Sequence, residues 1–529
     1  MTGFGDIFAG YSGRNRVSDR TGLGTVSAKH RVAKLTPKKR SKSNRKRVQP
    51  KKYRKESSRP KRSFTGEKKK RLTDSQARRV NIDSKPELQL FQPIAEQNAI
   101  SEQVWLEITP TAPLSNQGPI VIDVPRAENH YTDLYQSYFR IKTKLKRQDG
   151  GDIAKVFAKA TSKKTASAGD SAAKTTESSR PSQVAPINAF MTSLFSRVML
   201  MLQGVAVGSN TTFHPWISFF SSLLNFSDDA KRTLLEQQVG WLPDVVGDTR
   251  TADNDFSANF NLTNRREFLM KEREWFGRLH LDFFHQSRML PNNIAMSITL
   301  DRSTDDFLLI VGDEDTNRYS VEITQCSLFL RRVKLGDAAF QQIETRMTRE
   351  PAVYPFTRVD GRSFTIPVGT QRWRAGNLFS GFQPRRVLFG LLPQNAFVGT
   401  RSTNPYIFGH HNVNRVSFMN DTQSLTARPW EPDFESNQYM ECFWSLLRTL
   451  RKQESGQPLD VTFADYKTQH CLFALDLDAD PLSGSLLGSF SLEVGFKTHT
   501  DITLTGVVIG EFSSLVTITK DRAVTCVDY

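Results

Sequence analysis

Apolar and polar residues alternate along several stretches of this chain, and this period of two constrains its fold more than any other feature. In residues 134–146, LYQSYFRIKTKLK, the even positions from 140 onward are basic. The odd positions there are mostly apolar, with Tyr135, Phe139, Ile141 and Leu145. The pattern returns in residues 319–335 and 489–497. Because successive side chains of a strand point to opposite faces, each stretch predicts a half-buried β-strand.

Shorter apolar runs predict further strands, whereas helical patterns are scarce. The other strand candidates are residues 119–124, 197–203, 279–284, 293–300 and 514–520. The helix candidates are residues 214–226 and 228–239. Many short strands with few helices predict an all-β fold of sandwiches or jelly rolls rather than a parallel α/β sheet. A strand-rich part of about 430 residues is too long for one sandwich, so we expect two in tandem. No internal repeat is visible in the sequence.

A basic tail precedes a nearly neutral body. The net charge is +17, yet residues 1–80 hold 26 Lys or Arg and only 5 acidic residues. The other 46 basic and 50 acidic residues leave the rest of the chain at −4. With few apolar residues to offset the entropy of ordering, residues 1–85 are predicted to be a disordered arm. This asymmetry points to a polyanion partner for the arm alone.

The densest part of the arm is residues 37–62, PKKRSKSNRKRVQPKKYRKESSRPKR, with 14 Lys or Arg in 26 positions. Releasing counterions from roughly ten phosphates would make its binding to a polyanion strong and salt-dependent. Tyr53 and Phe64 are the only aromatic residues from 37 to 80, so we expect phosphate contact independent of base sequence. The segment PKKRSKSNRKR also fits a nuclear localisation signal.

The candidate residues for nucleic-acid binding or nuclear localisation share a positive charge and lie between positions 38 and 71. They are Lys38, Lys39, Arg40, Lys42, Arg45, Lys46, Arg47, Lys51, Lys52, Arg54, Lys55, Arg59, Lys61, Arg62, Lys68, Lys69, Lys70 and Arg71. The two roles do not exclude one another, and a run that is merely solvated is the third interpretation.

Residues 148–183 interrupt the strand pattern. They are mostly Ala, Ser, Lys and Thr, with almost no residues that could enter a core. This composition predicts a long loop inserted between two strands.

The sequence lacks the common patterns of catalytic and cofactor sites. There is no GxxxxGK[ST], no HExxH, no GxSxG and no helix-opening GxGxxG. The cysteines are Cys326, Cys442, Cys471 and Cys526. They are far apart without zinc-ligand spacing, which favours buried reduced thiols. In LDLDADP, residues 475–481, acidic residues alternate as in a calcium loop, but Pro481 stands where that loop needs Gly. We therefore expect no enzyme activity, no cofactor and no metal site.

The sequence also lacks the usual membrane signals. The N-terminus has no apolar core of a signal peptide, so secretion by that route is not expected. The most apolar window, NAFMTSLFSRVMLMLQGVAVG, contains Arg197 and Gln203 and fails as a membrane span.

Several blocks of the body resemble one family in collinear order. They are IVIDVPRAENHYTDLYQSYFRIKTKL (120–145), VAPINAFMTSLFSRVMLMLQGVAVG (184–208), FHPWISFFSSLLNFSDDAKRTLLEQQVGW (213–241), GRLHLDFFHQSRMLPNNIAMSITLDRSTDDFLL (277–309), YPFTRVDGRSFTIPVG (354–369), NLFSGFQPRRVLFGLLPQNAFVGTRSTNPYIFGHHNVN (377–414) and the C-terminal LFALDLDADP with the strands after it. They look like the double jelly-roll major capsid proteins, or hexons, of Polinton or Maverick elements and adintoviruses. These are related more distantly to the capsid proteins of virophages and adenoviruses.

The resemblance implies a first jelly roll at 86–340 and a second at 341–529, with residues 148–183 as an outward loop of the first. Three chains would form a pseudo-hexagonal homotrimer that tiles an icosahedral shell together with penton or minor capsid proteins. The expected location is the virion capsid, with the host nucleus during assembly. The basic arm departs from the family pattern, and we expect it to face the lumen and contact packaged double-stranded DNA.

Two other functions stay open at this point. One is a cellular nucleic-acid-binding protein with a β-rich interaction body, which would stay small in solution. The other is an enzyme or lectin on a jelly-roll scaffold, because a fold does not dictate its function. That second alternative requires a pocket with convergent polar groups.

Overall fold

The computed structural model describes residues 99–528, except 116–117, 151–152, 154–155, 158–178, 181, 245–255, 257–258, 314, 422, 454–458 and 478–486. The predicted arm of residues 1–85, most of the 148–183 insertion and the acidic turn beyond residue 477 lie outside the described residues.

The first half of the body holds two antiparallel four-stranded sheets. Sheet A consists of β1 (Ile100–Ile108), β12 (Tyr319–Leu335), β3 (Tyr131–Arg147) and β9 (Arg273–Gly277), in that order. Sheet B consists of β2 (Ile120–Val124), β10 (Met296–Arg302), β7 (Phe195–Leu202) and β8 (Val205–Val207). Together they form the first sandwich. Two short pairs accompany it: β4 (Val156–Phe157) with β5 (Ser179–Arg180), and β6 (Val184–Pro186) with β11 (Leu309–Val311).

The second half repeats this arrangement. Sheet C consists of β13 (Ala352–Ile366), β20 (Leu504–Ile518), β15 (Arg386–Pro393) and β18 (Leu472–Asp476), and β21 (Val524–Asp528) also pairs with β20. Sheet D consists of β14 (Arg372–Phe382), β19 (Leu487–Phe496), β16 (Val413–Asn420) and β17 (Gln423–Ser424). They form the second sandwich. Among the described residues, the strand pairs stay within one sandwich or the other.

The two sandwiches share one strand order. When the eight main strands of each are numbered along the chain, one sheet has the order 1-8-3-6 and the other 2-7-4-5. Antiparallel strands that wind in this way between two facing sheets make a jelly roll. The topology therefore contains an internal repeat that the sequence does not reveal.

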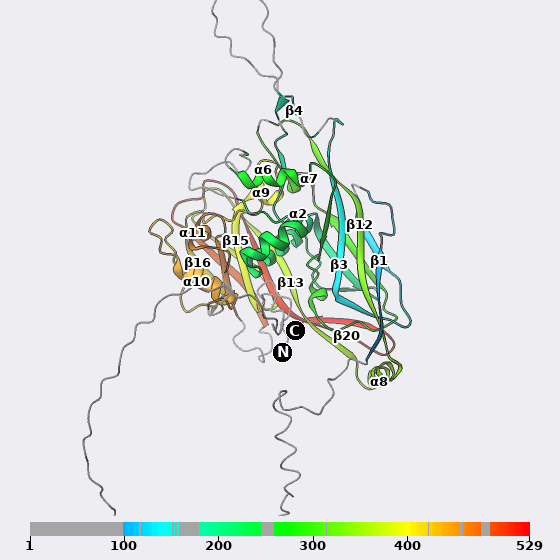
Figure 1. Cartoon of the computed structure of the whole chain (residues 1–529). Helices are drawn as coiled ribbons and strands as arrows, with labels where there is room; N and C mark the ends of the chain where they lie inside the picture. The colour runs from blue at the N-terminus through cyan, green and yellow to red at the C-terminus, as the bar shows by residue number, and fades with distance from the viewer. Residues whose placement is uncertain are drawn as a thin grey trace, which may run out of the picture. The chain divides into compact units, whose positions relative to one another are not determined.

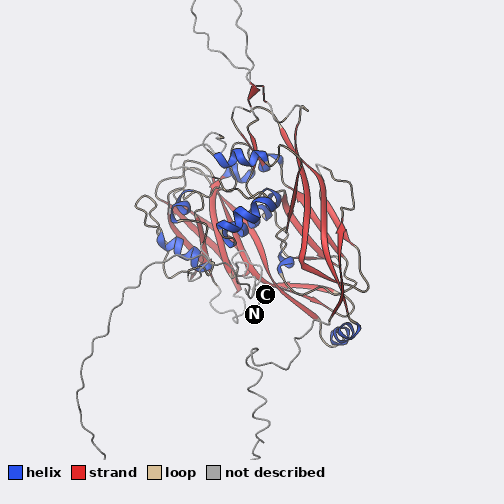
Figure 2. Ribbon diagram, viewed as in Figure 1, coloured by secondary structure: helices blue, strands red, loops and turns tan. Residues whose placement is uncertain are grey.

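Helices lie between the two sets of strands (Figures 1 and 2). Helix α3 (His214–Asn225) lies at the centre, and all of its residues are buried. The surface on which the two sandwiches meet, along α3, is called the seam below. The helical segments beside α3 are α2 (Phe190–Ser193), α4 (Asp228–Ala230), a π-helical turn (Lys231–Leu235), α5 (Glu236–Val239), a 3₁₀ turn (Asp282–His285) and α6 (Phe260–Glu267).

The remaining helices belong to connections. They are α7 (Asp305–Leu308), α8 (Asp337–Met347), α9 (Gln394–Val398), α10 (Met440–Thr449) and α11 (Phe463–Thr468). The domain boundary expected at 340/341 falls inside α8, which joins the two sandwiches, and the domain limits stay a prediction.

Most predicted elements are confirmed, and one is wrong. The alternating stretches form β3, β12 and β19, and the expected helix at 214–226 is α3. The expected strand at 279–284 instead ends in the 3₁₀ turn at Asp282–His285. Its Leu279, Leu281 and Phe283 are buried, as one buried face of a strand requires, but residues 279–284 form no strand in the described structure. Asp282 there accepts backbone N–H groups from two other segments, which takes the place of a strand ladder.

The cysteine prediction is largely confirmed. Cys326, Cys442 and Cys471 are buried thiols, whereas Cys526 on strand β21 is partly exposed. Burial raises the pKa of Cys326 and of Cys442 to about 12, so both stay protonated at neutral pH.

Candidate functional site

The basic residues expected to contact nucleic acid, from Lys38 to Arg71, lie outside the described residues. Their role therefore stays a prediction. The features below belong to the described body. They are a small cavity beside the seam, the contacts that join the two sandwiches, and two apolar surfaces.

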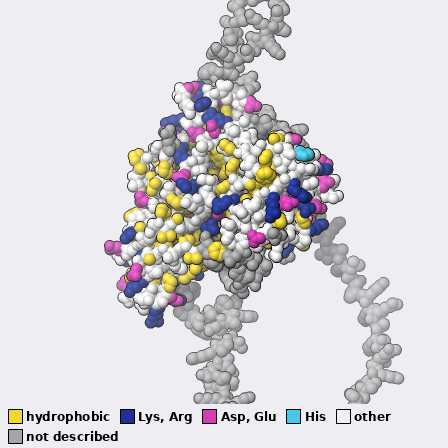
Figure 3. Space-filling view, turned by 180° about the vertical axis from the view of Figure 1, so that it is seen from behind, with side chains coloured by type: hydrophobic (Ala, Val, Ile, Leu, Met, Phe, Trp, Pro, Cys, Tyr) yellow, Lys and Arg dark blue, Asp and Glu magenta, His cyan; other side chains and the backbone are white. Residues whose placement is uncertain are grey.

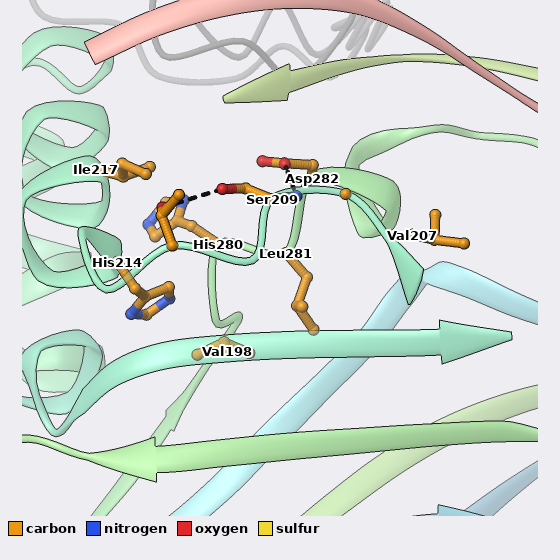
Figure 4. Close-up of a pocket in the computed structure, with 10 residues that line it drawn as sticks. Val198, Val207, Ser209, His214, Ile217, His280, Leu281 and Asp282 are labelled. Atoms are coloured by element: carbon orange, nitrogen blue, oxygen red, sulfur yellow. Dashed lines mark hydrogen bonds between the residues drawn. The ribbon is translucent and has the colours of Figure 1, made fainter. Parts of the chain in front are cut away.

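A small cavity with a partly polar lining lies within the first sandwich, beside the seam (Figure 4). It is lined by Val198, Val207, Gly208, Ser209, Thr211, His214, Ile217, His280, Leu281 and Asp282. Its volume of about 20 Å³ is enough for a single water molecule. A cavity of this size offers no room for an organic substrate.

The carboxylate of Asp282 joins two segments that are far apart in sequence. Its Oδ2 atom accepts the backbone N–H of Ser209 at 3.0 Å and that of Val359, on β13 of the second sandwich, at 3.2 Å. Burial raises the pKa of Asp282 to about 7, and the two hydrogen bonds oppose this rise. This carboxyl group therefore titrates near neutral pH while it connects the two sandwiches.

His214 and His280 line the cavity together with this carboxylate, and His285 stacks on His280. His214 on α3 places Nδ1 3.1 Å from the carbonyl oxygen of Phe195, and the rings of His280 and His285 stack with centroids 5.8 Å apart. Burial lowers the pKa of His214 and of His285 to about 4, and it lowers that of His280 well below its usual value. All three imidazoles are neutral at pH 7 and serve packing and hydrogen bonding. Across the described ranges, no group of three His, Cys, Asp or Glu is placed to hold a metal ion.

A buried ammonium group also joins the two sandwiches. Lys231 is almost fully buried, and its Nζ donates to the carbonyl oxygen of Leu223 and to Asp460 Oδ2, each at 2.8 Å. Burial lowers the pKa of Lys231, and Asp460 opposes the shift. Lys452 donates to the carbonyl oxygen of Leu224 at 2.6 Å. Because Asp460 and Lys452 belong to the second sandwich, these contacts hold the end of α3 against it.

Large apolar side chains reach the surface of the body. Figure 3 shows one face on which hydrophobic side chains gather over a broad area, with acidic and basic side chains among them. Two such groups lie on defined elements, one on sheet A and one on helix α10.

The first group crosses the solvent-facing side of sheet A and is called the aromatic face. It consists of Trp105 on β1, Phe329 on β12, Tyr138 on β3 and Phe276 on β9. The rings of Tyr138 and Phe329 stack with centroids 5.1 Å apart, and Trp105 and Phe276 lie 5.6 and 6.0 Å from Tyr138. Trp105 is 46% exposed and Phe276 37%. One aromatic side chain from each strand thus forms a continuous apolar strip.

The second group lies on helix α10 and is called the α10 surface. Met440 is 52% exposed and Trp444 is 49% exposed, one helical turn apart. The opposite side of the helix is anchored by buried Cys442 and Leu446. The exposed residues are therefore held in place on a packed element.

Comparisons with known proteins bear on the fold. No family model matches the chain. A relative, an uncharacterized protein of Caenorhabditis elegans, is 23% identical over 281 residues, which cover 52% of this chain and 65% of that protein. The matched part is thus less than two thirds of the relative's length.

Among solved structures, the Sputnik virophage structure determined by cryo-EM matches with a TM-score of 0.53 and 11% identity, over 84% of this chain and 92% of that one. The mavirus major capsid protein matches with a TM-score of 0.48 and 8% identity, over 83% and 92%. The fold is a double jelly roll. The strand order found twice in the body and the Sputnik match agree on this point, and the fold expected from the sequence resemblance is confirmed. At such low identity the likeness concerns the fold alone.

The sequence contained a signal for the aromatic face, which sequence reasoning missed. Tyr138 stands between Gln136 and Arg140 on the even positions of the predicted strand, which are polar from 136 onward apart from Tyr138. An aromatic residue there marks an apolar spot on the solvent-facing side. Phe329 could not be found in this way. A bulge between Ile323 and Gln325 shifts the alternation of β12 by one residue, which turns Phe329 outward.

None of the described helices combines the length and apolar character that a membrane crossing requires.

Proposed function

We propose that this chain is a viral major capsid protein of the hexon type, and that three copies form a pseudo-hexagonal homotrimer that tiles an icosahedral shell. The observation that carries the proposal is the jelly-roll strand order that occurs twice in one chain. Two like sandwiches per chain give six in a trimer, and six like units approximate a hexagon. Closed cyclic symmetry of this kind is common among homo-oligomers.

The seam supports this proposal. The two sandwiches meet on a buried helix and on buried polar contacts, so each chain would enter a trimer as one rigid unit. A lattice needs such rigidity, because flexible pairs of domains would not hold a fixed hexagonal outline.

The finer parts of the proposal follow from the sequence. The arm of residues 1–85 faces the lumen and contacts packaged double-stranded DNA, and it directs the chain to the host nucleus for assembly. The jelly rolls comprise residues 86–340 and 341–529. The capsid also contains penton or minor capsid proteins, and the chain belongs to the Polinton and adintovirus type of hexon.

One finding agrees with the cellular alternative as well as with a capsid protein, so the two have to be separated by experiment. The relative from Caenorhabditis elegans comes from an animal, which agrees with an integrated element or with a host protein that binds nucleic acid. The two possibilities differ in assembly, because a capsid protein forms capsomers whereas the cellular adaptor stays monomeric.

The experiment is the absolute mass and shape of the full chain. The protein is treated with nuclease and purified at about 0.5 M salt, where contacts with phosphates are weak. Light scattering on a sizing column and negative-stain electron microscopy follow. A trimer with a hexagonal outline is the expected result. A compact monomer at all concentrations would overturn the proposal in favour of the cellular alternative.

A further inference from the structure

The aromatic face has the size of an interface. Strand β1 has 9 residues and sheet A has four strands. The four strands have 9, 17, 17 and 5 residues, and at about 3.3 Å per residue and about 4.8 Å between strands the whole sheet covers roughly 760 Å². Side-chain relief increases this area toward the roughly 800 Å² that each partner buries in a standard protein interface. Aromatic residues at the centre of such a patch are the usual anchors of binding.

The charges around the aromatic face pair with one another. The pairs are Arg140 with Glu107 and Glu274, Lys142 with Glu274, Lys146 with Glu322, and Arg331 with Asp133. The four basic and four acidic groups of these pairs cancel, and exposed Lys144 on β3 adds a single positive charge, far fewer than a polyanion-binding surface needs. An apolar centre with a polar rim of matched charges fits a protein partner.

The α10 surface lies on the other side of the body. In Figure 1, α10 and β1 stand at opposite sides of the described structure. The two surfaces differ, since one is a flat strip of rings on a sheet and the other a helical ridge with Met440 and Trp444. Two unlike apolar surfaces on opposite sides of one chain are the arrangement that a head-to-tail contact between copies needs, and such contacts close into rings.

We infer that the aromatic face of one copy docks on the α10 surface of a second copy. This inference rests on the proposed capsomer and names the surfaces that would join its chains. Each chain then contributes its first sandwich to one neighbour and its second sandwich to the other, so that sandwiches of the two kinds alternate around the ring.

The test uses two variants of the full chain that leave the buried residues intact. One is Trp105→Ser with Phe276→Ser, which removes the exposed rings of the aromatic face. The other is Met440→Ser with Trp444→Ser, which removes the apolar ridge of α10. Phe260→Ser is the matched control, because Phe260 on α6 is 71% exposed and belongs to neither surface. Circular dichroism and thermal melting check that each variant is folded.

Sedimentation velocity then gives the oligomeric state over a range of concentrations. Each double variant is expected to dissociate with an apparent constant raised more than about tenfold, whereas the control stays a trimer like the wild type. Mixing the two folded double variants is the sharper measurement. Each retains the surface that the other lost, so the mixture is expected to form 1:1 dimers, although neither variant associates alone.

The outcomes separate the inference from the proposed function. A monomeric wild-type chain would overturn the capsomer itself. A trimeric wild type whose double variants also stay trimeric would overturn the inference and leave the capsomer standing. Loss of the trimer in the Phe260→Ser control would also overturn it, because the effect would not belong to these two surfaces. Dimers formed by the α10 variant alone would show that the aromatic face pairs with itself instead.

Discussion

The rings of Phe219 and Tyr406 stack face to face across the seam, with centroids 4.2 Å apart and planes 1° from parallel. Phe219 belongs to α3 in the first sandwich, and Tyr406 follows α9 in the second. Trp241 stacks on Phe219 as well, at 5.4 Å, and the Tyr406 hydroxyl contacts the hydroxyl of Ser193. The union of the two sandwiches thus depends on aromatic packing completed by a buried hydrogen bond.

Removing the Phe219 ring or the Tyr406 hydroxyl is expected to lower the stability of the folded body. Phe219→Ala should lower the free energy of unfolding by about 3–5 kcal/mol, the usual cost of removing a buried aromatic side chain. Tyr406→Phe keeps the stack but removes the hydroxyl, and should cost about 1–2 kcal/mol. Urea unfolding followed by tryptophan fluorescence measures both, with Phe260→Ala as an exposed control expected within about 0.5 kcal/mol of the wild type. Equal effects for Phe219→Ala and Phe260→Ala would contradict this account of the seam.

The strands were predictable from the sequence where one side of a sheet faces solvent. In β3 the buried residues Phe139, Ile141 and Leu145 alternate with basic ones, and the period of two is visible without a structure. The equivalent strand of the second sandwich, β15, shows no alternation because residues 386–392 are all buried. It lies near α3, where Phe408 approaches Gly390 on one side and contacts Phe220 on the other.

This difference explains why the internal repeat was not predictable. Strands β3 and β15 hold the same place in the strand order but meet different neighbours, so their sequences differ in pattern. The strand order itself depends on pairings such as β1 with β12, whose partners lie more than 200 residues apart in the chain. Local periodicity contains no information about such pairings. The resemblance to capsid proteins supplied the architecture that the patterns alone left open.

Gly399 allows the second sandwich to approach the first. Its φ is +89°, and a Cβ built on it would lie 2.9 Å from the Cα of Phe307, a backbone atom of the first sandwich that cannot easily move. Gly399→Ala should therefore combine backbone strain with a clash and lower the free energy of unfolding by more than about 2 kcal/mol.

Two glycines serve as matched controls for this prediction. Gly369 has a φ of +78° with no neighbour within 4 Å, so Gly369→Ala should show the strain alone, about 1 kcal/mol. Gly376 has neither feature, and Gly376→Ala should stay within about 0.5 kcal/mol of the wild type. Chemical denaturation ranks the three variants. A Gly399→Ala effect no larger than that of Gly369→Ala would argue against close contact at this point.

The stability of the seam should depend on pH through Asp282. Its pKa in the native protein is about 7, above the usual 3.8, so the native state binds more protons than the unfolded chain between these values. The stabilisation from this group is therefore present at low pH and is lost as the pH rises from about 4 to about 7. His214 and His285, with pKa values lowered to about 4, act in the opposite direction and lose their contribution as the pH falls below about 6.5.

Asp282→Asn isolates the first of these effects. The amide oxygen can still accept the N–H groups of Ser209 and Val359, but it cannot ionise. The free energy of unfolding of the variant, relative to the wild type, is expected to rise steadily from pH 4 to pH 7. Urea unfolding at several pH values measures this difference, and Glu350→Gln, just beyond the end of α8, controls for the loss of one exposed acid. A difference that does not change with pH would show that burial does not perturb this carboxyl.

The basic arm should account for all DNA binding by the chain, because the rest of the protein has a net charge of −4. Neutralising roughly ten phosphates predicts a slope of about −9 in a plot of log affinity against log salt, with no preference among duplex sequences. Replacing all the candidate basic residues between Lys38 and Arg71 with Gln should abolish DNA binding at about 100 mM salt. The oligomeric state should stay that of the wild type. Fluorescence anisotropy with unrelated duplexes measures the binding, and a fusion of residues 37–71 to a fluorescent protein reports nuclear import separately. Import without DNA binding would assign the arm to targeting alone, because a packaging role requires contact with phosphates that survives at this ionic strength.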